Sequence, residues 1–303
     1  MKSKITVIGS SNTDMVIQTS KFPAPGETII GGKFFMNPGG KGANQAVAAA
    51  RLGGRVSLIA KVGDDIFGKQ SMDNFEKEGI DTSCMATDKD YPSGVALITV
   101  DSKGENHIVV ASGANAHLNP QDIDAAMHVL ENSSFVLMQL EIPLATVEYV
   151  AKTCFQKNIQ VILDPAPAQT LSETLLQNLY LVTPNKTEAE QLSGIKVNNR
   201  SEAEKAAEKI IEMGAKNVII TLGSEGALIK NMEMTKFIPA PIVEPIDSTA
   251  AGDIFNGALA VALSENYSLE EAVEFANKAA SISVTRMGAQ SSAPYKNEVF
   301  SSN

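Results

Sequence analysis

Short, continuous apolar runs alternate along this chain with segments of helical periodicity. The runs occupy residues 5–8, 135–140, 159–163, 180–182 and 218–222. Continuous apolar runs predict strands buried on both faces, because a half-exposed strand would alternate apolar with polar residues. Between them, Asn119-Pro120, Pro143 and the capping-box sequence Ser201-Glu202-Ala203-Glu204 predict helix starts. The pattern therefore predicts an α/β fold with a mostly parallel central sheet flanked by helices.

One region departs from this alternation. Residues 94–100 and 107–110 are apolar on both faces and flank the turn-rich segment 101–106, which predicts a β-hairpin. The Gly-rich segment 15–35 is similarly extended. Together they predict a small β lid, about 14–37 and 93–112, on a single α/β domain spanning 1–303. The alternative is a pair of edge strands in the main sheet.

Polar residues follow the predicted strands where each one ends. They are Asn12, Asp14, Glu141, Asp164 and Asn185, and Gly223 takes the same place after a further strand. Ligands of parallel α/β sheets collect at the carboxyl ends of the strands, so these residues predict the binding site.

Charge narrows the function classes. The 303 residues include 25 Lys and Arg against 35 Asp and Glu, a formal net charge of −10. Such a chain is unsuited to general nucleic-acid binding or to anionic membrane surfaces. No run reaches a membrane-spanning length, the first apolar run is too short for a signal peptide, and the two cysteines match no redox or metal spacing. We therefore expect a cytoplasmic protein.

The segment from Asp247 to Gly257 carries the strongest chemical signal. Its small residues, Ala250 to Gly252, lead into an apolar helix and place backbone N–H groups and the positive helix end beside Asp253. Amides that stabilise a moving phosphoryl group, next to a carboxylate that takes a proton, suit phosphoryl transfer. The alternative is that Asp253 only satisfies the first turn of the helix.

A second glycine-rich segment, Asn37 to Asn44, precedes an Ala-rich helix. Its glycines allow a ligand to approach the backbone, and Asn44 can both donate to and accept from a polyol. Packing alone would also explain the glycines. The usual nucleotide motifs are absent: there is no G-x-x-x-x-G-K-[ST], no G-x-G-x-x-G and no protein-kinase signature.

Taken together, these motifs resemble those of the ribokinase, or PfkB, family of sugar and nucleoside kinases. The resemblance covers essentially the whole chain. It depends on Gly39 to Asn44 and on Asp247 to Asp253, in family-like order and separation, and extends to Asn185-Lys186-Thr187-Glu188, Thr221 to Gly226 and Gly288-Ala289-Gln290. Ser248 and Asp164 depart from the family's usual Thr and Asn. These departures bear on which sugar is preferred rather than on the type of reaction.

The resemblance implies roles for individual residues. Asp253 matches the catalytic base, and Ala250, Ala251 and Gly252 match the anion hole. The sugar would be held by Asn12, Asp14, Gly40, Lys41, Asn44 and Glu141. The ATP positions are Asn185, Thr221, Gly223, Ser224, Gly226, Gly252 and Asn277. A K+ site would involve Asp247, Thr249, Ser283, Arg286, Gly288 and Ser292, several of them through backbone carbonyls, and Glu188 matches a residue linked to Mg2+ and phosphate.

The implied activity is ATP-dependent phosphorylation of D-ribose at O5 with Mg2+ and K+, by a homodimer that pairs through its β lids. Two alternatives remain: a kinase for deoxyribose, fructose or tagatose, and a non-catalytic sugar-binding regulator of the same fold. An intact Asp253 argues against the regulator, because a protein that only binds sugar has no need of a base.

Overall fold

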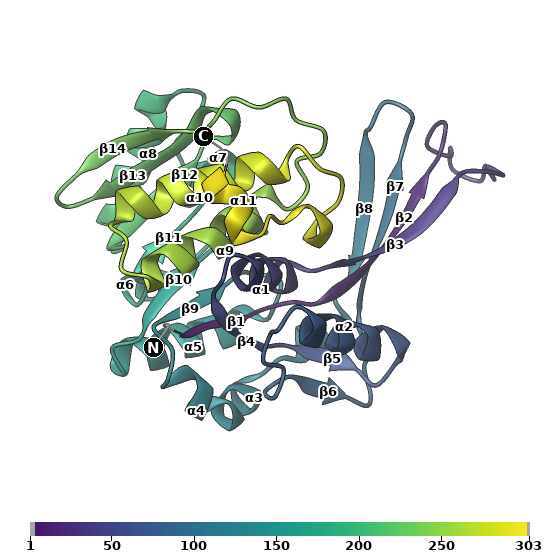
Figure 1. The fold of residues 1–303 in the computed structure, drawn as a ribbon, viewed down its shortest axis with the longest axis horizontal. Coiled ribbons are helices and arrows are strands. Elements are labelled where there is room, and N and C mark those ends of the chain that lie inside the picture. The colour runs from purple at the N-terminus through teal and green to yellow at the C-terminus, as the bar shows by residue number, and fades with distance from the viewer. Residues whose placement is uncertain (1–3, 302–303) are drawn as a thin grey trace.

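Within residues 4–301, which the computed structural model describes, eight strands form the central sheet (Figure 1). In spatial order they are β14 (Thr235–Pro239), β13 (Gly226–Asn231), β12 (Asn217–Thr221), β11 (Leu181–Val182), β10 (Gln160–Leu163), β9 (Phe135–Met138), β1 (Lys4–Ile8) and β4 (Arg55–Ile59). The six strands from β12 to β4 run parallel, and β13 and β14 are antiparallel at one edge. The predicted fold class is confirmed.

Alternate residues of the parallel strands enter two different hydrophobic cores. On β9, Leu137 packs into one core and Val136 into the other, because successive side chains of a strand point to opposite faces. The first core is covered by α1 (Lys41–Arg51), α2 (Ile66–Lys77), α9 (Ala251–Ser264), α10 (Leu269–Ser283) and α11 (Lys296–Ser301). The second is covered by α3 (Pro120–Ala125), α4 (Met127–Leu130), α5 (Leu144–Gln156), α6 (Glu173–Gln177), α7 (Lys186–Ser193) and α8 (Arg200–Glu212).

A second sheet stands away from the body, on the right in Figure 1. We call it the projecting sheet; its order is β3 (Lys33–Gly39), β2 (Asn12–Gln18), β7 (Gly94–Val100) and β8 (Asn106–Ala111). The hairpin and the extended segment are therefore joined in one separate sheet rather than placed at the edge of the main sheet. A short parallel pair, β5 (Lys61–Gly63) with β6 (Ala86–Asp88), lies near its base.

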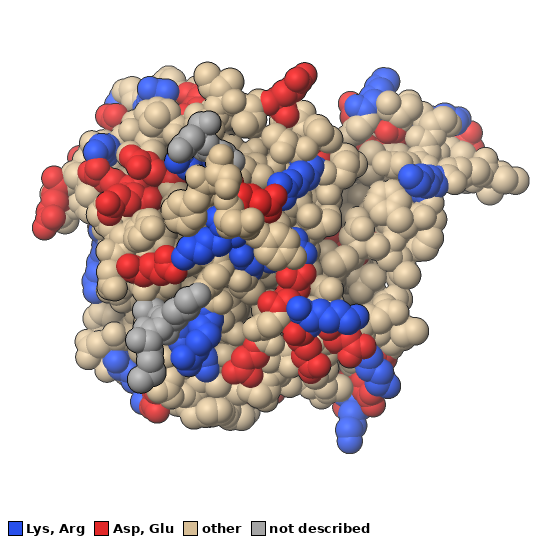
Figure 2. All heavy atoms as spheres, viewed as in Figure 1, with Lys and Arg blue, Asp and Glu red and all other residues tan. Residues whose placement is uncertain are grey.

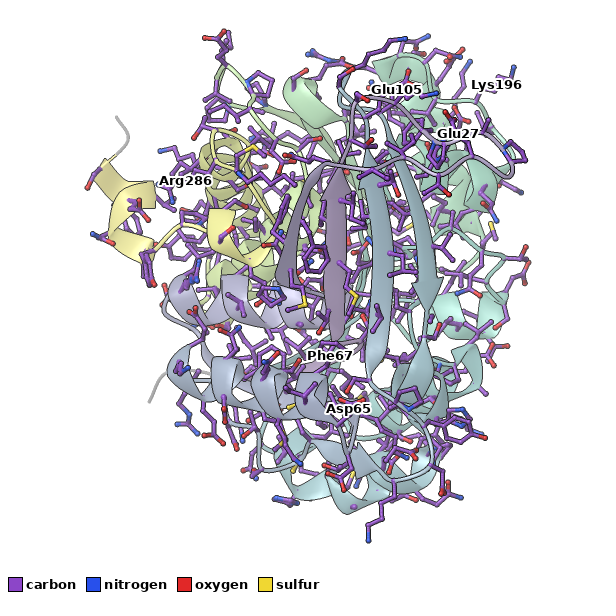
Figure 3. The ribbon with its side chains drawn as sticks, turned by 90° about the vertical axis from the view of Figure 1, so that its right-hand side faces the viewer. Glu27, Asp65, Phe67, Glu105, Lys196 and Arg286 are labelled. Atoms are coloured by element: carbon purple, nitrogen blue, oxygen red, sulfur yellow. The ribbon has the colours of Figure 1, made fainter. Side chains whose placement is uncertain are left out.

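Figure 3 shows the projecting sheet face-on, with Glu27 and Glu105 at its tip and Asp65 at its base. Asp65 caps α2 and also accepts hydrogen bonds from the backbone N–H (2.7 Å) and hydroxyl (2.7 Å) of Ser93, the residue before β7. The sheet is thus anchored at its base by a carboxylate of the α/β body.

Several predicted boundaries are wrong. The helix expected from Asn119 breaks at Ala126 into α3 and α4, although the Asn119 capping box is present. The capping box expected at Ser201 is not formed, because the N-cap of α8 is Asn199, two residues earlier in the chain. The two antiparallel edge strands β13 and β14 were not predicted.

Candidate active site

The site lies where the first turns of α1 and α9 meet the carboxyl ends of the central strands. Gly42 in α1 lies so close to the end of β1 that a Cβ would be 2.6 Å from the backbone carbon of Gly9. Gly40 has φ of +90°, with its own Cβ position 2.7 Å from the amide nitrogen of Asn12. Only glycine satisfies both constraints, which explains the glycine-rich segment before α1.

Asp253 is buried in the first turn of α9, with 4% of its surface exposed. Its two oxygens accept hydrogen bonds from Asn44 Nδ2 at 2.9 Å and Gln45 Nε2 at 3.0 Å. Burial raises the pKa of Asp253, and the Lys41 charge and both amide donors work against that rise. The carboxylate is therefore held in one orientation and is more basic than an exposed aspartate.

A second buried carboxylate shares a donor with Asp253. Gln45 Nε2 also donates to Asp164 Oδ2 at 2.8 Å, and Gln139 Nε2 donates to Gln45 Oε1 at 2.5 Å. Burial raises the pKa of Asp164 well above its ordinary value. Asp164 thus lies at the strand ends as expected, and Gln139 fixes which end of the Gln45 amide faces the two carboxyl groups.

Lys41 is the cation of this acidic site. Burial lowers the pKa of its ammonium group, but the charges of Asp253, Asp164, Glu141 and Glu188 oppose that effect and together raise the pKa above the ordinary lysine value. Lys41 therefore stays charged and balances several carboxylates at once.

A cavity of about 400 Å³ opens between the projecting sheet and the body. Its walls include Asn12, Val110, Asn115 and Glu141. Glu141 accepts hydrogen bonds from Ser10 Oγ (2.5 Å) and from the Lys41 backbone N–H (3.0 Å). We call this space the polar cavity. It combines carboxylate and amide groups, as a polyol ligand requires.

Asp14 belongs to the same surroundings, although it does not line the polar cavity. A Cβ on Gly39 would be 2.3 Å from its carboxylate, so only glycine fits opposite it. Burial, assisted by the charges of Glu141 and Asp253, raises the pKa of Asp14 to about 6.

A second cavity of about 570 Å³ lies beside α9 and α10. Six of the seven expected ATP positions line it: Thr221, Gly223, Ser224, Gly226, Gly252 and Asn277. We call it the elongated cavity. Apolar walls come from residues that the sequence did not single out, among them Phe255, Ile242 and Val284. Asn185, the seventh position, is placed differently: it forms a β-bridge with Thr221 and caps α7.

Glu188 is held by that cap. Its two carboxylate oxygens accept hydrogen bonds from the backbone N–H (2.7 Å) and Nδ2 (2.8 Å) of Asn185. Burial raises the pKa of Glu188, while its hydrogen bonds to Asn185 and the charge of Lys41 oppose the rise.

Three backbone amides were expected to form the anion hole at the start of α9. Ala250 has left-handed φ of 59°, and the Ala251 N–H already donates to Ser248 O at 3.2 Å. Within residues 4–301, the N–H groups of Gly252 and Asp253 have no acceptor. The Gly252 amide, one of the three expected, and the neighbouring Asp253 amide are therefore available to donate hydrogen bonds to an anion.

The expected cation positions fall into two groups. Asp247 accepts hydrogen bonds from the Thr249 hydroxyl (2.6 Å) and from the Gly288 N–H (2.8 Å), which joins two distant segments. The other side chains turn elsewhere: Ser283 and Ser292 donate to nearby carbonyls, and Arg286 pairs with Glu298. Of the residues described, no three His, Cys, Asp or Glu side chains form a metal-binding group.

Sequence reasoning missed Ser10, Gln45, Asn115 and Gln139, all buried at the site. Gln45 directly follows the segment that was recognised, in a helix whose first residues were expected to bind a ligand, and this position was a usable signal. The others gave none, because their partners are distant in the chain.

Comparison with known proteins shows similarity to carbohydrate kinases along nearly the whole chain. The family model described as pfkB family carbohydrate kinase matches residues 2–296. A ribokinase from Haemophilus influenzae is 45% identical over 300 residues, covering 99% of this chain and 98% of the relative. A deoxyribokinase from Salmonella typhi is 38% identical over 291 residues, covering 96% and 95%.

Solved structures of ribokinases are similar to this chain over nearly its whole length. The chain is similar to ribokinase from Thermotoga maritima, with a TM-score of 0.90 and 44% identity over 99% of this chain and 98% of the other. It is also similar to Arabidopsis thaliana ribokinase complexed with ribose and ATP, with a TM-score of 0.93 and 31% identity over 99% and 98%. The chain belongs to the pfkB family of carbohydrate kinases.

Proposed function

We propose that this protein is a ribokinase, which transfers the γ-phosphoryl group of ATP to O5 of D-ribose. The observation that carries the proposal is the position of Asp253. It is buried next to Gly252, one of the residues that line the elongated cavity, and its carboxylate accepts a hydrogen bond from Nδ2 of Asn44 in α1. Relatives named ribokinase support ribose as the sugar.

In this mechanism the polar cavity holds the sugar and the elongated cavity holds ATP. Asp253 accepts the proton of the attacking sugar hydroxyl while the hydroxyl oxygen forms a bond to the γ-phosphorus of ATP. The bond between the γ-phosphorus and the β–γ bridging oxygen breaks, and ADP is released. The free N–H groups of Gly252 and Asp253 stabilise charge on the moving phosphoryl group. Lys41 balances the negative charge that collects there.

Mg2+ would arrive with ATP and neutralise phosphate charge. Glu188 fits a water-mediated role toward it, because both of its oxygens already accept hydrogen bonds from Asn185. For K+, the candidate ligand atoms between Asp247 and the 288–292 loop are oxygens: one carboxylate, hydroxyls and carbonyls. Such a set suits a hard monovalent cation, which would fix the segment that leads into α9.

The projecting sheet would act as a lid and as the contact of a homodimer. Residues paired across its strands share a face, so Asn12, Asp14 and Ile98 face the same side as Val110, which lines the polar cavity. The opposite face exposes Ile17, Phe34, Met36, Leu97 and Val109. In Figure 2 this sheet is mostly tan, with its charged side chains near the tip.

We further propose a cytoplasmic location. Among the described residues, no helix has both the length and the apolar character that crossing a bilayer requires.

A second candidate substrate is 2-deoxyribose, because a deoxyribokinase is 38% identical to this chain. ADP formation with ribose, 2-deoxyribose, fructose and tagatose separates the candidates. We expect the highest kcat/KM with ribose. A higher value with another sugar would reassign the substrate, and ADP formation with none of them would overturn the proposal.

A further inference from the structure

Asn115 is a buried polar residue at the junction between the projecting sheet and the body. It lies in the 3-10 helix Gly113–His117, four residues after the end of β8, and only 1% of its surface is exposed. It also lines the polar cavity. None of the motifs considered above includes it.

Two backbone partners fix the orientation of the Asn115 amide. Its Oδ1 accepts from the Ser11 N–H at 2.9 Å, and its Nδ2 donates to the Ser11 carbonyl at 3.1 Å. A backbone N–H can only donate and a carbonyl can only accept, so the amide cannot be reversed without losing both bonds. The second hydrogen of Asn115 Nδ2 is donated to Asn12 Oδ1 at 2.8 Å.

This last bond determines what Asn12 offers to a ligand. Because Oδ1 of Asn12 is occupied as an acceptor, its Nδ2 is the end left for the cavity. Among residues 4–301, Nδ2 of Asn12 has no hydrogen-bond partner, and Asn12 lines the polar cavity beside Glu141. The cavity therefore presents a donor from Asn12 and acceptors from Glu141.

We infer that Asn115 is a positioning residue that fixes Asn12 as a hydrogen-bond donor to one hydroxyl oxygen of the sugar, an inference that rests on the proposed ribokinase function. A hydroxyl group can accept from the Asn12 amide and donate to a carboxylate at the same time. If Asn12 were reversed, its oxygen would face that hydroxyl's lone pairs, and the loss in sugar binding would be about 10- to 100-fold.

Asn115→Asp tests this inference, because it keeps the shape of the side chain and removes the NH2 group that donates to Asn12. Asn12 then turns its own NH2 toward the new carboxylate and its oxygen toward the cavity. We expect the KM for ribose to rise about 10- to 100-fold, with the KM for ATP unchanged. Asn119→Asp is the matched control: Asn119 caps α3 through Oδ1, a role that Asp fills equally well.

Sugar analogues distinguish positioning from a general structural role. Wild type and variant are compared with ribose and with its 1-, 2- and 3-deoxy analogues. The penalty of the variant should vanish for the one analogue that lacks the hydroxyl bound by Asn12. An equal penalty with every analogue would overturn the inference while leaving the proposed function intact. Wild type without ribose turnover would overturn the proposed function and the inference together.

A double-mutant cycle gives an independent result. In Asn12→Ala the residue that Asn115 positions is absent, so adding Asn115→Asp should raise the KM for ribose little further. Independent, multiplying effects would contradict the inference. If Asn115→Asp does not fold, as judged by thermal unfolding, Asn115→Ala replaces it in both experiments, because it removes the same donor without introducing a charge.

Discussion

At the scale of single residues, Asp253 is the first test of the chemistry. Asp253→Asn should leave the fold and ribose binding nearly intact, while kcat falls at least about 10²-fold, the usual contribution of a general base. The fold should tolerate the change because Asn has nearly the same size and shape as Asp and still fills the buried position in the first turn of α9. Initial rates, ribose titration and thermal unfolding measure the three quantities. Wild-type turnover in the folded variant would contradict the assigned role.

Asp14 predicts a dependence of stability on pH. Its pKa of about 6 in the folded protein lies above the ordinary 3.8, owing to burial and to the charges of Glu141 and Asp253. The folded state therefore binds more protons than the unfolded state in this window, and stability is lost as the pH rises from about 4 through 6. Asp14→Asn removes this effect, so its free energy of unfolding at pH 8 should exceed that of wild type by up to about 3 kcal/mol.

Urea denaturation at pH 8 and pH 5 checks this prediction. The advantage of Asp14→Asn should shrink toward pH 5, because wild-type Asp14 becomes protonated, and its KM for ribose should rise because a carboxylate acceptor is lost. An equal stability difference at both pH values would show that ionisation of Asp14 is not its cause.

At the scale of helices and strands, the sequence predicted element types better than their ends. The continuous apolar runs correctly indicated buried parallel strands, because burial on both faces demands apolar residues at every position. The sequence pattern did not reveal β13 and β14. Their antiparallel pairing depends on contacts between segments rather than on local pattern.

The start of α8 shows the same limit at one position. Asn199 and Ser201 are both good N-cap residues, and the structure selects Asn199, whose side chain accepts from the Glu202 N–H at 3.0 Å. We expect Asn199→Ala to lower the free energy of unfolding by about 1 kcal/mol. Ser201→Ala, the matched control, should change it little. The reverse order in urea denaturation would contradict the cap assignment.

The candidate site divides in a similar way. Residues in signature segments, such as Asn44 and Asp253, were predicted and are hydrogen-bonded to each other. Gln139 and Asn115 were not, because each acts on a residue about 94 or 103 positions away in the chain. Local pattern carries no information about such pairs; only the fold brings them together.

The segment before α9 carries the prediction for K+. Activity in K+ should exceed activity in Na+ or in a bulky ammonium buffer, and Asp247→Ala should abolish the difference. Asp247 also caps a turn, through the Thr249 N–H at 2.9 Å, so turn capping needs its own control. Asp101→Ala supplies it, because Asp101 caps a turn at the tip of the projecting sheet. Equal rates in all three buffers, after removal of contaminating K+, would leave the cation site without support.

At the scale of the whole molecule, the proposed roles of the projecting sheet link sugar binding to dimer assembly. Its two faces are both apolar, and one sheet cannot leave both in water without cost. The register now separates them: Ile98 shares the face of Asn12 and Asp14, whereas Leu97, 56% exposed, lies on the other face with Val109. The first face should contact the sugar, and the second should contact a partner copy related by a two-fold axis.

Neighbouring substitutions on one strand test this division. Leu97→Asp should convert a dimer into a monomer, because pairing would bury an unpaired carboxylate, whereas Ile98→Asp should keep the dimer and raise the KM for ribose. Each variant serves as the control for the other, since both add one charge to β7. Sedimentation velocity at micromolar concentration and ribose kinetics measure the two effects. A monomeric wild type would contradict the dimer, and loss of dimer in Ile98→Asp but not in Leu97→Asp would reverse the assignment of the faces.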